Sequence, residues 1–370
     1  MDGQRSQAII SGESIKNNFE YIKTLVPKET RVIAVVKADA YGHGAAEVCH
    51  TLEKAGCGFF AVASFDEGVK LRECGVKSDI LVLGVTPPRF ADEICSNDLI
   101  QAVNSVEYAK ALSASAPRLR VHIKVDTGMS RLGLYCHNEG DISAATHDIL
   151  QIASLANLNI EGIFTHYACS DNLPPPGGED FTKKQFFIFT KLCGECAKAG
   201  VEPGIRHCCN SGGIINYPET CLDAVRAGIL LYGFMPNGQK NKSLSPAMRF
   251  VSHIAQISRL KKGDKVSYGG GFTAERDLDA AVVSVGYADG FSRRLSGNAS
   301  LAINGVRARV IGRICMDLCV ADVTGISCKV GDEAEVFGNI ITADELARAL
   351  GTINYEVLCS VSGRVVKKYI

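Results

Sequence analysis

The feature that most constrains the fold of this chain is a regular alternation of short apolar runs with amphipathic stretches over its first 235 residues. The apolar runs are continuous and rich in valine and isoleucine, which is typical of parallel strands buried on both faces. Eight runs have this character: residues 31–37, 59–64, 80–84, 99–103, 121–126, 160–167, 204–209 and 224–233. Eight strands with helices between them predict a (β/α)₈ TIM barrel, although the alternation by itself is also compatible with an open, doubly wound sheet.

The pattern changes after Gly233. The polar segment 237–246 (NGQKNKSLSP) has no periodicity and is the expected linker. Beyond it, strand-like runs such as MRFVSHIAQISRL and DAAVVSVGY are separated by turn signals, which indicates a mostly β domain. We therefore expect three parts: an N-terminal strand over residues 1–10 that associates with the β domain, a barrel over 11–240, and a C-terminal β domain over 241–370.

The composition excludes several classes of protein. The chain has 370 residues, of which 46% are hydrophobic and 22% charged, as in ordinary globular proteins. Its 40 basic residues balance 40 acidic ones, so there is no electrostatic footprint for nucleic acid. Its N-terminus has no apolar core of signal-peptide length, and no run of about 18 apolar residues could span a membrane. We expect a cytoplasmic protein.

The 15 cysteines do not indicate a disulfide framework or a metal site. Their number is odd and their spacing is not that of a small disulfide-rich scaffold, which favours free thiols in a reducing compartment. Cys193 and Cys196 form a single CxxC inside a stretch that is expected to be helical, and no second pair would complete a zinc site. We expect packing cysteines and no bound metal.

Polar side chains gather at the carboxyl ends of the expected strands, where a barrel places its active site. They include Lys37 at the end of the first strand, Lys124 in the fifth, His166 in the sixth, Ser211 after the seventh and Arg226 in the eighth. If the strands close into a barrel, these side chains meet at one mouth.

Lys37 follows the apolar run VIAVV, where partial desolvation lowers the pKa of a lysine and favours the free amine. Such an amine can form a Schiff base with an aldehyde, although a lysine at a strand end can also simply reach the solvent. Ser211, the two glycines after it and Gly228 supply backbone N–H groups where barrels often bind phosphate. A reactive lysine opposite a phosphate-binding loop suggests pyridoxal 5′-phosphate (PLP) as cofactor.

The segment VVKADAYGHG resembles the PLP-lysine signature of the alanine racemases, which usually reads VKANAYGHG. Eight further segments resemble motifs of that family, in the family's order and over essentially the whole chain: HIKVDTGMSRLG, GIFTHYA, CCNSGG, VRAGILLYG, KVSYGGGF, VGYADGF, GRICMDLC and INYEVLCSVSGRV. The resemblance implies a PLP-dependent isomerase that interconverts L-alanine and D-alanine and supplies D-alanine for peptidoglycan.

The resemblance implies two bases on opposite faces of the substrate Cα. Lys37 holds PLP and takes the D-face proton, and Tyr268 takes the L-face proton. A free tyrosine has a pKa near 10, so this base needs assistance at neutral pH, for which the resemblance offers His166 and Arg226. The resemblance also places Arg226 against the pyridine nitrogen of PLP. Because arginine offers only donors, that nitrogen should stay unprotonated, which weakens the electron sink and suppresses side reactions.

The remaining roles also come from the resemblance. Residues that hold the phosphate are Tyr41, Ser211, Gly228, Ile229 and Tyr355. Arg131 and Met316 contact the substrate carboxylate, with Asp317 beside them in a supporting role. Lys124 matches a lysine that is carbamylated in many members, where the carbamate would orient Arg131 by a charge-assisted pair; an unmodified Lys124 in an ion pair is the alternative. Residues expected at the entrance are Tyr287, Tyr355, Asp171, Arg293 and Arg313.

The resemblance further implies a head-to-tail homodimer in which Tyr268, Tyr287 and Met316 enter the site of the second subunit. Tyr355 favours alanine as substrate, since relatives that prefer serine have a smaller polar residue there. The chain departs from the common pattern at Asp39, where asparagine is usual, and at Ser130, where glycine is frequent. Its end, SGRVVKKYI, also lacks the usual proline-arginine pair.

Three alternatives remain at this point. A serine or broad-specificity amino-acid racemase would share every catalytic residue. A PLP-dependent decarboxylase has the same architecture but places an acidic residue where this chain has Arg226. A PLP-carrier protein consists of a barrel alone, which the roughly 130 residues after Gly233 speak against.

Overall fold

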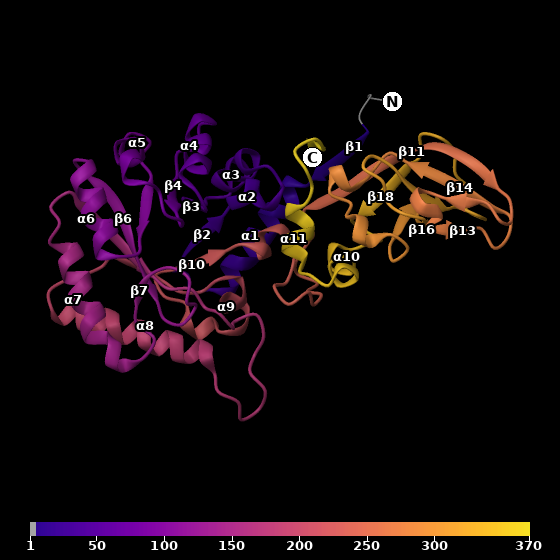
Figure 1. Cartoon of the computed structure of the whole chain (residues 1–370). Helices are drawn as coiled ribbons and strands as arrows, with labels where there is room; N and C mark the ends of the chain where they lie inside the picture. The colour runs from indigo at the N-terminus through magenta and orange to yellow at the C-terminus, as the bar shows by residue number, and fades with distance from the viewer. Residues whose placement is uncertain (1–4) are drawn as a thin grey trace.

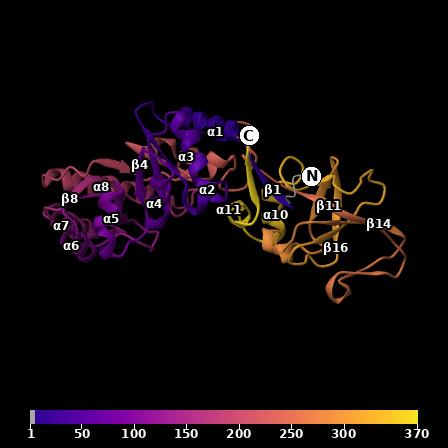
Figure 2. The ribbon, with the colours of Figure 1, turned by 90° about the horizontal axis from the view of Figure 1, so that it is seen from above.

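The computed structural model describes residues 5–370, which form two bodies side by side along one long axis (Figures 1 and 2). The N-terminal body is a closed barrel of parallel strands, and the C-terminal body is built on a mostly antiparallel sheet. This confirms the predicted fold class and excludes the doubly wound sheet. Residues 1–4 of the expected N-terminal strand lie outside the described residues.

The barrel closes through a ring of eight parallel strands in the order β5-β4-β3-β2-β10-β9-β8-β6, with β6 pairing back to β5. Their bounds are β2 (Arg31–Val35), β3 (Phe59–Val62), β4 (Asp79–Val82), β5 (Ile100–Val103), β6 (Leu119–Asp126), β8 (Leu158–Phe164), β9 (Ile205–His207) and β10 (Ala224–Ala227). The two-residue strand β7 (Leu134–Tyr135) extends β6. Most strands end before the apolar runs predicted from the sequence do. The polar residues near the ends of those runs therefore lie beyond the strands, at the mouth of the barrel.

Helices cover the outside of the barrel (Figure 1). They are α1 (Gly12–Leu25), α3 (Ala45–Lys54), α4 (Phe65–Glu73), α5 (Ala91–Ser96), α6 (Val106–Ser115), α7 (Ile142–Ala153), α8 (Phe181–Lys198) and α9 (Ser211–Asn216). Several begin at a side chain that accepts a backbone N–H, as Ser11, Ser64, Ser105, Asp180 and Asn210 do. Short 3₁₀ turns lie at η1 (Pro88–Phe90), η2 (Glu139–Asp141), η3 (Pro218–Thr220) and η4 (Ile229–Tyr232).

The C-terminal sheet has the strand order β14-β17-β16-β15-β18-β11-β1-β19. Its strands are β1 (Ser6–Ile10), β11 (Met248–Leu260), β14 (Leu278–Val283), β15 (Ser300–Ile303), β16 (Val306–Ile311), β17 (Cys319–Asp322), β18 (Glu333–Phe337) and β19 (Val366–Tyr369). The first described strand, β1, pairs antiparallel with β11 and parallel with β19, so both ends of the described chain lie in this sheet. The helices α10 (Ala343–Leu350) and α11 (Asn354–Cys359) lie between the sheet and the barrel (Figure 1).

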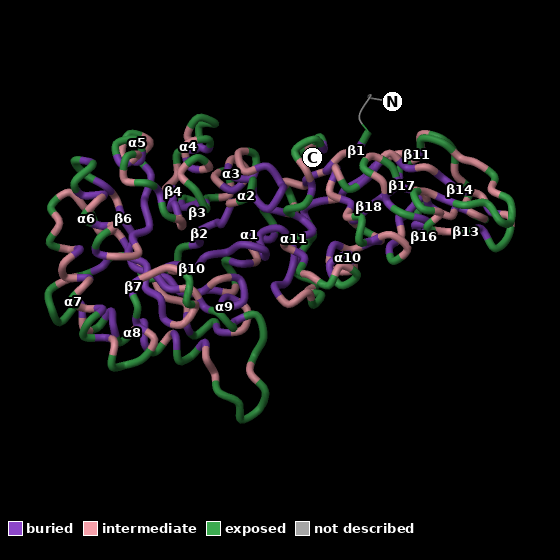
Figure 3. Tube along the Cα trace, in the orientation of Figure 1, coloured by how far each residue is buried: buried purple, intermediate pink, exposed green. Residues whose placement is uncertain are grey.

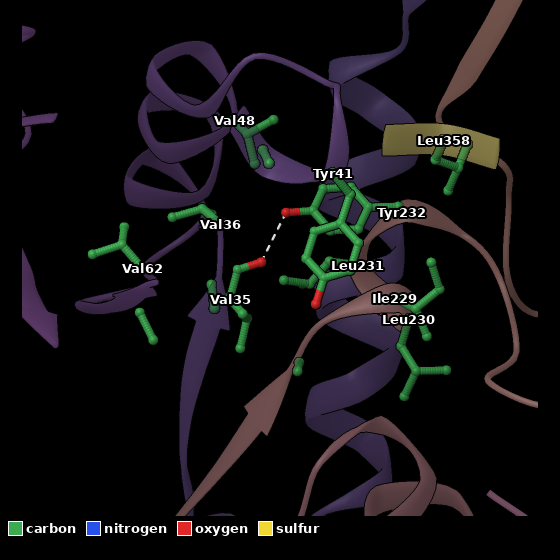
Figure 4. Packing of buried hydrophobic residues seen from close by; sticks show 14 of the residues in the cluster. Val35, Val36, Tyr41, Val48, Val62, Ile229, Leu230, Leu231, Tyr232 and Leu358 are labelled. Atoms are coloured by element: carbon green, nitrogen blue, oxygen red, sulfur yellow. Dashed lines mark hydrogen bonds between the residues drawn. The ribbon is translucent and has the colours of Figure 1, made fainter. Parts of the chain in front are cut away.

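Buried residues run through the barrel strands and continue into the C-terminal sheet (Figure 3). Where the two bodies meet, Tyr41 and Tyr232 pack between the end of β2 and Leu358 of α11 (Figure 4). The Tyr232 hydroxyl donates to the carbonyl oxygen of Val35 at 2.9 Å. Helix α11 is therefore docked directly behind the mouth of the barrel.

All 15 cysteines are free thiols, and Cys193 and Cys196 are buried in α8 as packing residues. Within residues 5–370 no cluster of histidine, cysteine and acidic side chains has the arrangement of a metal site. No helix in the same range is both long and apolar enough to pass through a bilayer.

Candidate active site

Lys37 lies two residues beyond the end of β2, at the start of the five-residue element α2 (Lys37–Tyr41). The four residues that follow it, Ala38, Asp39, Ala40 and Tyr41, all have φ between 52° and 54°. A left-handed conformation costs an L-residue about 1–2 kcal/mol, so four in succession need support from their surroundings. This turn aims the lysine out of the strand, which corrects the expectation that Lys37 ends the strand itself.

Contacts on two sides hold this left-handed turn. The Glu67 carboxylate accepts the Ala38 N–H at 2.6 Å. The Nδ1 atom of buried His43 lies 3.0 Å from the carbonyl oxygen of Ala40 and 3.1 Å from that of Tyr41, so it donates to both. Burial lowers the pKa of His43 to about 4, so the ring is neutral.

Beside the turn, the mouth of the barrel encloses a cavity of about 470 Å³. Ten of the residues predicted from the sequence line it: Lys37, Tyr41, Lys124, Arg131, His166, Ser211, Arg226, Gly228, Ile229 and Tyr355. They come from five of the eight strand ends and from α11. Side chains and backbone from far-apart segments of the chain thus converge on one space.

Two lysines face this cavity with weakened affinity for protons. Burial, followed by the positive charge of Arg131, lowers the pKa of Lys37. The same two causes lower the pKa of Lys124 to about 8. The Lys124 ammonium lies 5.5 Å from the centre of the Phe164 ring and forms no salt bridge with any described residue. Burial and Arg131 therefore favour the uncharged form of both amines more than in a free lysine.

Arg226 is buried at the floor of the cavity, where its guanidinium is almost fully satisfied. It donates to the carbonyl oxygens of Thr165 and Cys208 at 2.7 and 3.0 Å and lies 3.2 Å from Nδ1 of His166. Burial lowers the pKa of Arg226 to about 10, so it remains a cation at neutral pH. Such a group can hydrogen-bond a ligand only as a donor.

Two histidines that the sequence reasoning missed extend this network. Arg226 lies 2.7 Å from Nδ1 of His207, and His207 Nε2 lies 2.9 Å from His122 Nδ1. Burial lowers the pKa of both rings, that of His122 to about 3. Neutral His207 therefore accepts from Arg226 and donates to His122. Both rings are fully buried, His122 two residues before Lys124 and His207 two residues before Cys209, and no local signal in the sequence marks them.

The loops after β9 and β10 approach one another closely. The Ser211 hydroxyl accepts the Gly228 N–H at 3.0 Å, and the Asn210 side chain accepts the Gly213 N–H at 2.9 Å. A Cβ atom on Gly228 would lie 2.7 Å from the Tyr41 hydroxyl, so a side chain there would block the space. Small residues and the hydroxyls of Ser211 and Tyr41 form a cradle at this point, after the strands where barrels often bind phosphate.

Seven predicted site residues do not line the cavity. Tyr268, Tyr287 and Met316 are 71%, 41% and 53% exposed on the C-terminal body. Tyr268 lies in η5 (Tyr268–Gly270), between the short strands β12 (Lys265–Val266) and β13 (Phe272–Thr273). Tyr287 lies on the short turn η6 (Tyr287–Asp289).

The other four residues of this set also lie outside the cavity. Arg293, on η7 (Arg293–Leu295), and Arg313 are exposed. Asp317 pairs with Arg364 at 2.6 Å, and the carboxylate of Asp171 lies beside Gly212, where burial raises its pKa. Asp39, the departure nearest to Lys37, pairs with Lys367 at 2.9 Å and lines a different cavity.

Comparison with known proteins gives a consistent result over the full chain. The family model "Alanine racemase, N-terminal domain" matches residues 10–236, and "Alanine racemase, C-terminal domain" matches residues 247–369. The chain is 40% identical to an alanine racemase of Desulfovibrio desulfuricans, over 98% of this chain and 97% of the relative. It is 41% identical to alanine racemase 1 of Clostridium acetobutylicum, over 98% and 95%.

Solved structures of the same kind superpose closely. An alanine racemase of Clostridium difficile 630 matches with a TM-score of 0.93 at 36% identity, over 100% of this chain and 97% of that one. The alanine racemase of Bacillus anthracis with bound L-Ala-P matches with a TM-score of 0.90 at 29% identity, over 99% and 95%.

Proposed function

The chain belongs to the alanine racemase family and interconverts L-alanine and D-alanine, and we propose that each of its sites combines a lysine of one chain with a tyrosine of a second. The observation that identifies the mouth of the barrel as the site of this activity is the convergence of Lys37, Arg226 and the Gly228 cradle on one cavity of about 470 Å³. The family depends on PLP. When bound, this cofactor supplies an aldehyde for an amine and an electron-withdrawing ring that acidifies the Cα–H bond of an amino acid.

The residues around the cavity fit this cofactor. The Ser211 and Tyr41 hydroxyls and the backbone N–H groups of Gly228 and Ile229 would hold its phosphate, in the space that a side chain on Gly228 would fill. Tyr355 reaches the same space from α11, with its ring 5.8 Å from that of Tyr41. These groups orient the ligand without adding a fixed positive charge at the phosphate.

Arg226 would donate to the pyridine nitrogen. A buried cation that offers only donors is incompatible with a protonated ring nitrogen, so it limits how much charge the ring withdraws from Cα. The proton is then returned quickly to Cα, which favours racemisation over transamination. The backbone carbonyls of Thr165 and Cys208 keep the guanidinium in place for this task.

Lys37 would serve as the base on one face of Cα, because burial and the positive charge of Arg131 lower the pKa of its amine and so favour the form that can accept a proton. The base on the other face would be Tyr268. This residue is 71% exposed and does not line the cavity of its own chain, which supports delivery from a second copy. Neutral His166, backed by Arg226 at 3.2 Å, would stabilise the phenolate form of that incoming tyrosine.

The same second copy would bring Tyr287 and Met316, also exposed, to the entrance. We place Arg131 at the substrate carboxylate with the Met316 backbone N–H opposite it, and Asp317 in a supporting position. Asp171, Arg293 and Arg313 would line the approach. The assembly is a head-to-tail homodimer with two shared sites.

The activity is tested by incubating the holoenzyme with L-alanine in deuterated water, followed by chiral analysis. D-alanine labelled at Cα is expected. Pyruvate as the main product would indicate transamination, and ethylamine would indicate decarboxylation. Either result would overturn the proposal.

The shared site is tested by mixing two inactive variants, Lys37→Ala and Tyr268→Phe. Random exchange makes about half of the dimers mixed, each with one complete site, so about a quarter of the activity should return. If both bases belonged to the same chain, no activity would return. Activity per chain should also fall on dilution below the dimer constant.

Lys124 is proposed to carry a carbamate that orients Arg131. A pKa of about 8 and the lack of a salt bridge within the described residues leave its amine free to react with CO₂. The protein in ¹³C-labelled bicarbonate should show a carbamate resonance that Lys124→Gln removes. A spectrum without that resonance would leave Lys124 as an unmodified amine.

Alanine is the preferred substrate in this proposal, and the product D-alanine would serve peptidoglycan synthesis in the cytoplasm. Tyr355 lines the cavity from α11, and its ring would leave little room beyond the methyl group of alanine, which would disfavour serine. Restored growth of a D-alanine auxotroph that expresses this chain is the expected outcome. Failure to restore growth despite activity in the lysate would point to a different biological role.

A further inference from the structure

The left-handed turn after Lys37 is the most strained segment at the mouth of the barrel. Four residues without glycine's freedom, Ala38 to Tyr41, hold positive φ in succession. At about 1–2 kcal/mol each, these conformations persist only where other contacts over-determine them. The direction in which Lys37 points depends on this turn, because the turn begins at the lysine itself.

One acidic side chain joins this turn to its neighbour strand. Glu67 lies in the first turn of α4, and one of its carboxylate oxygens accepts the Ala38 N–H at 2.6 Å. The other oxygen accepts the N–H groups of Ala63 and Ser64 at 2.7 and 3.3 Å. Ala38 and Ala63 follow the adjacent strands β2 and β3, and both line the active-site cavity.

Two bonds make the capping box of α4: the Ser64 N–H donates to the Glu67 carboxylate, and Ser64 Oγ accepts the Glu67 N–H at 3.4 Å. A capping box needs only the bonds to Ser64. The bond to Ala38 is additional, spans 29 residues of sequence and is the shortest that the carboxylate makes. The cap of α4 alone therefore does not account for the position of the Glu67 carboxylate.

We propose that Glu67 is a positioning residue for the racemisation, whose carboxylate clamps the ends of β2 and β3 together and so fixes the direction of the Lys37 side chain. The proposal rests on the proposed function for its catalytic consequence. Glu67 itself does not line the cavity and touches no reacting atom.

The charge of Glu67 gives a second observable. Burial, Arg131 and Arg226 lower the pKa of Lys37, whereas the Glu67 carboxylate and the Cys359 thiol act to raise it. Glu67 is the acidic side chain with the largest effect on this amine. Removing its charge should therefore lower the pKa of Lys37 further.

The experiment compares Glu67→Gln and Glu67→Asp with two control variants. Ser64→Ala weakens the α4 cap but leaves the bond to Ala38, and Asp66→Asn removes a charge from an exposed neighbour in the same helical turn. The expected result is a kcat about 10- to 100-fold lower for both Glu67 variants, with KM for alanine little changed. Both controls should keep the wild-type kcat.

The second measurement needs neither cofactor nor substrate. Competitive acetylation of the apoprotein across pH, read by mass spectrometry of the Lys37 peptide, reports the pKa of that amine. It should shift downward in Glu67→Gln and stay closer to the wild-type value in Glu67→Asp, which keeps the charge but withdraws it from Ala38.

Wild-type kcat together with an unshifted acetylation profile in Glu67→Gln would overturn the proposal. An equal loss of kcat in Ser64→Ala would show that Glu67 acts only through the cap of α4, and this too would overturn the proposal. If Glu67→Gln does not fold, the folded Glu67→Asp variant decides by its kcat. A wild-type enzyme that does not racemise alanine would instead refute the proposed function, while the acetylation result would still stand.

Discussion

The mouth of the barrel and the exposed face of the C-terminal body carry the two halves of the proposed chemistry in opposite ways. In the barrel, Arg226 is buried and donates to several acceptors, and Lys37 sits on a turn that is held from two sides. On the C-terminal body, Tyr268 is 71% exposed at the tip of a short hairpin. One half is organised by its own fold, whereas the other would acquire its surroundings from the second chain of the proposed dimer.

The two regions also differ in how they hold histidine. His43, His122 and His207 are fully buried in the barrel, whereas His253 of the C-terminal body is partly exposed and is its one histidine. Neutral imidazoles serve as hydrogen-bonding groups beneath the site, and this makes the barrel the acid-sensitive part of the molecule.

The largest expected effect is that of Lys37→Ala on the barrel half. Loss of both the cofactor attachment and one base should lower racemase activity about 10⁴-fold or more. The near-visible absorbance of lysine-bound PLP should also vanish. The exposed Lys16→Ala is the matched control and should behave as wild type. If Lys37→Ala retained that absorbance, the cofactor would be attached to a lysine other than Lys37.

Tyr268→Phe probes the exposed half and should be somewhat less severe. Removing one general base should lower racemisation about 10²- to 10⁴-fold. In deuterated water the variant should still exchange the Cα proton of D-alanine through Lys37, without forming L-alanine. Tyr135→Phe, at a tyrosine that is 61% exposed on the barrel, should change nothing. Full racemisation by Tyr268→Phe would remove Tyr268 from the mechanism.

Acid should destabilise the barrel more than the C-terminal body. Burial lowers the pKa of His43 to about 4 and that of His122 to about 3, below the value near 6.5 in the unfolded chain. Below pH 6.5 the unfolded chain binds protons that the buried histidines of the folded barrel do not bind. The free energy of unfolding therefore falls as the pH falls, by about 2 kcal/mol per histidine at pH 5.

Hydrogen exchange in rising urea, compared at pH 7.5 and pH 5 and corrected for intrinsic rates, would locate this loss. Barrel peptides should lose protection at lower urea at pH 5, and β-domain peptides should shift much less. His253→Gln should leave the pH dependence unchanged. Earlier loss of protection in the C-terminal body would contradict the assignment of acid sensitivity to the buried imidazoles.

The smallest effect concerns a residue that joins the two regions. Tyr355 belongs to α11 but lines the barrel cavity. Tyr355→Ser should raise the ratio of kcat/KM for serine over alanine about tenfold, within the range that a hydroxyl or methylene can supply. Tyr355→Phe keeps the ring and should leave the ratio near the wild-type value. An unchanged ratio in Tyr355→Ser would place substrate selection elsewhere.

The alternation of apolar runs and the order of the motifs were sufficient to predict the barrel, the β domain and ten residues that line the cavity. Parallel strands buried on both faces have a composition that few other elements share, so their number and order are readable directly. Lys37 and Arg226 could be assigned because each follows or lies within such a run. His122 and His207 could not, because a histidine in a buried strand has no local sign of its partner.

The left-handed turn at Ala38–Tyr41 and the Glu67 bond that spans it were decided by the tertiary structure. No local propensity favours four alanine, aspartate and tyrosine residues at positive φ, so only contacts with α4 and His43 make that conformation stable. The sequence by itself determined which elements form and which polar side chains follow the barrel strands, because periodicity and residue type are local. The direction of Lys37, the burial of the histidines and the exposure of Tyr268 depend on which distant segments meet, and that only the folded chain decides.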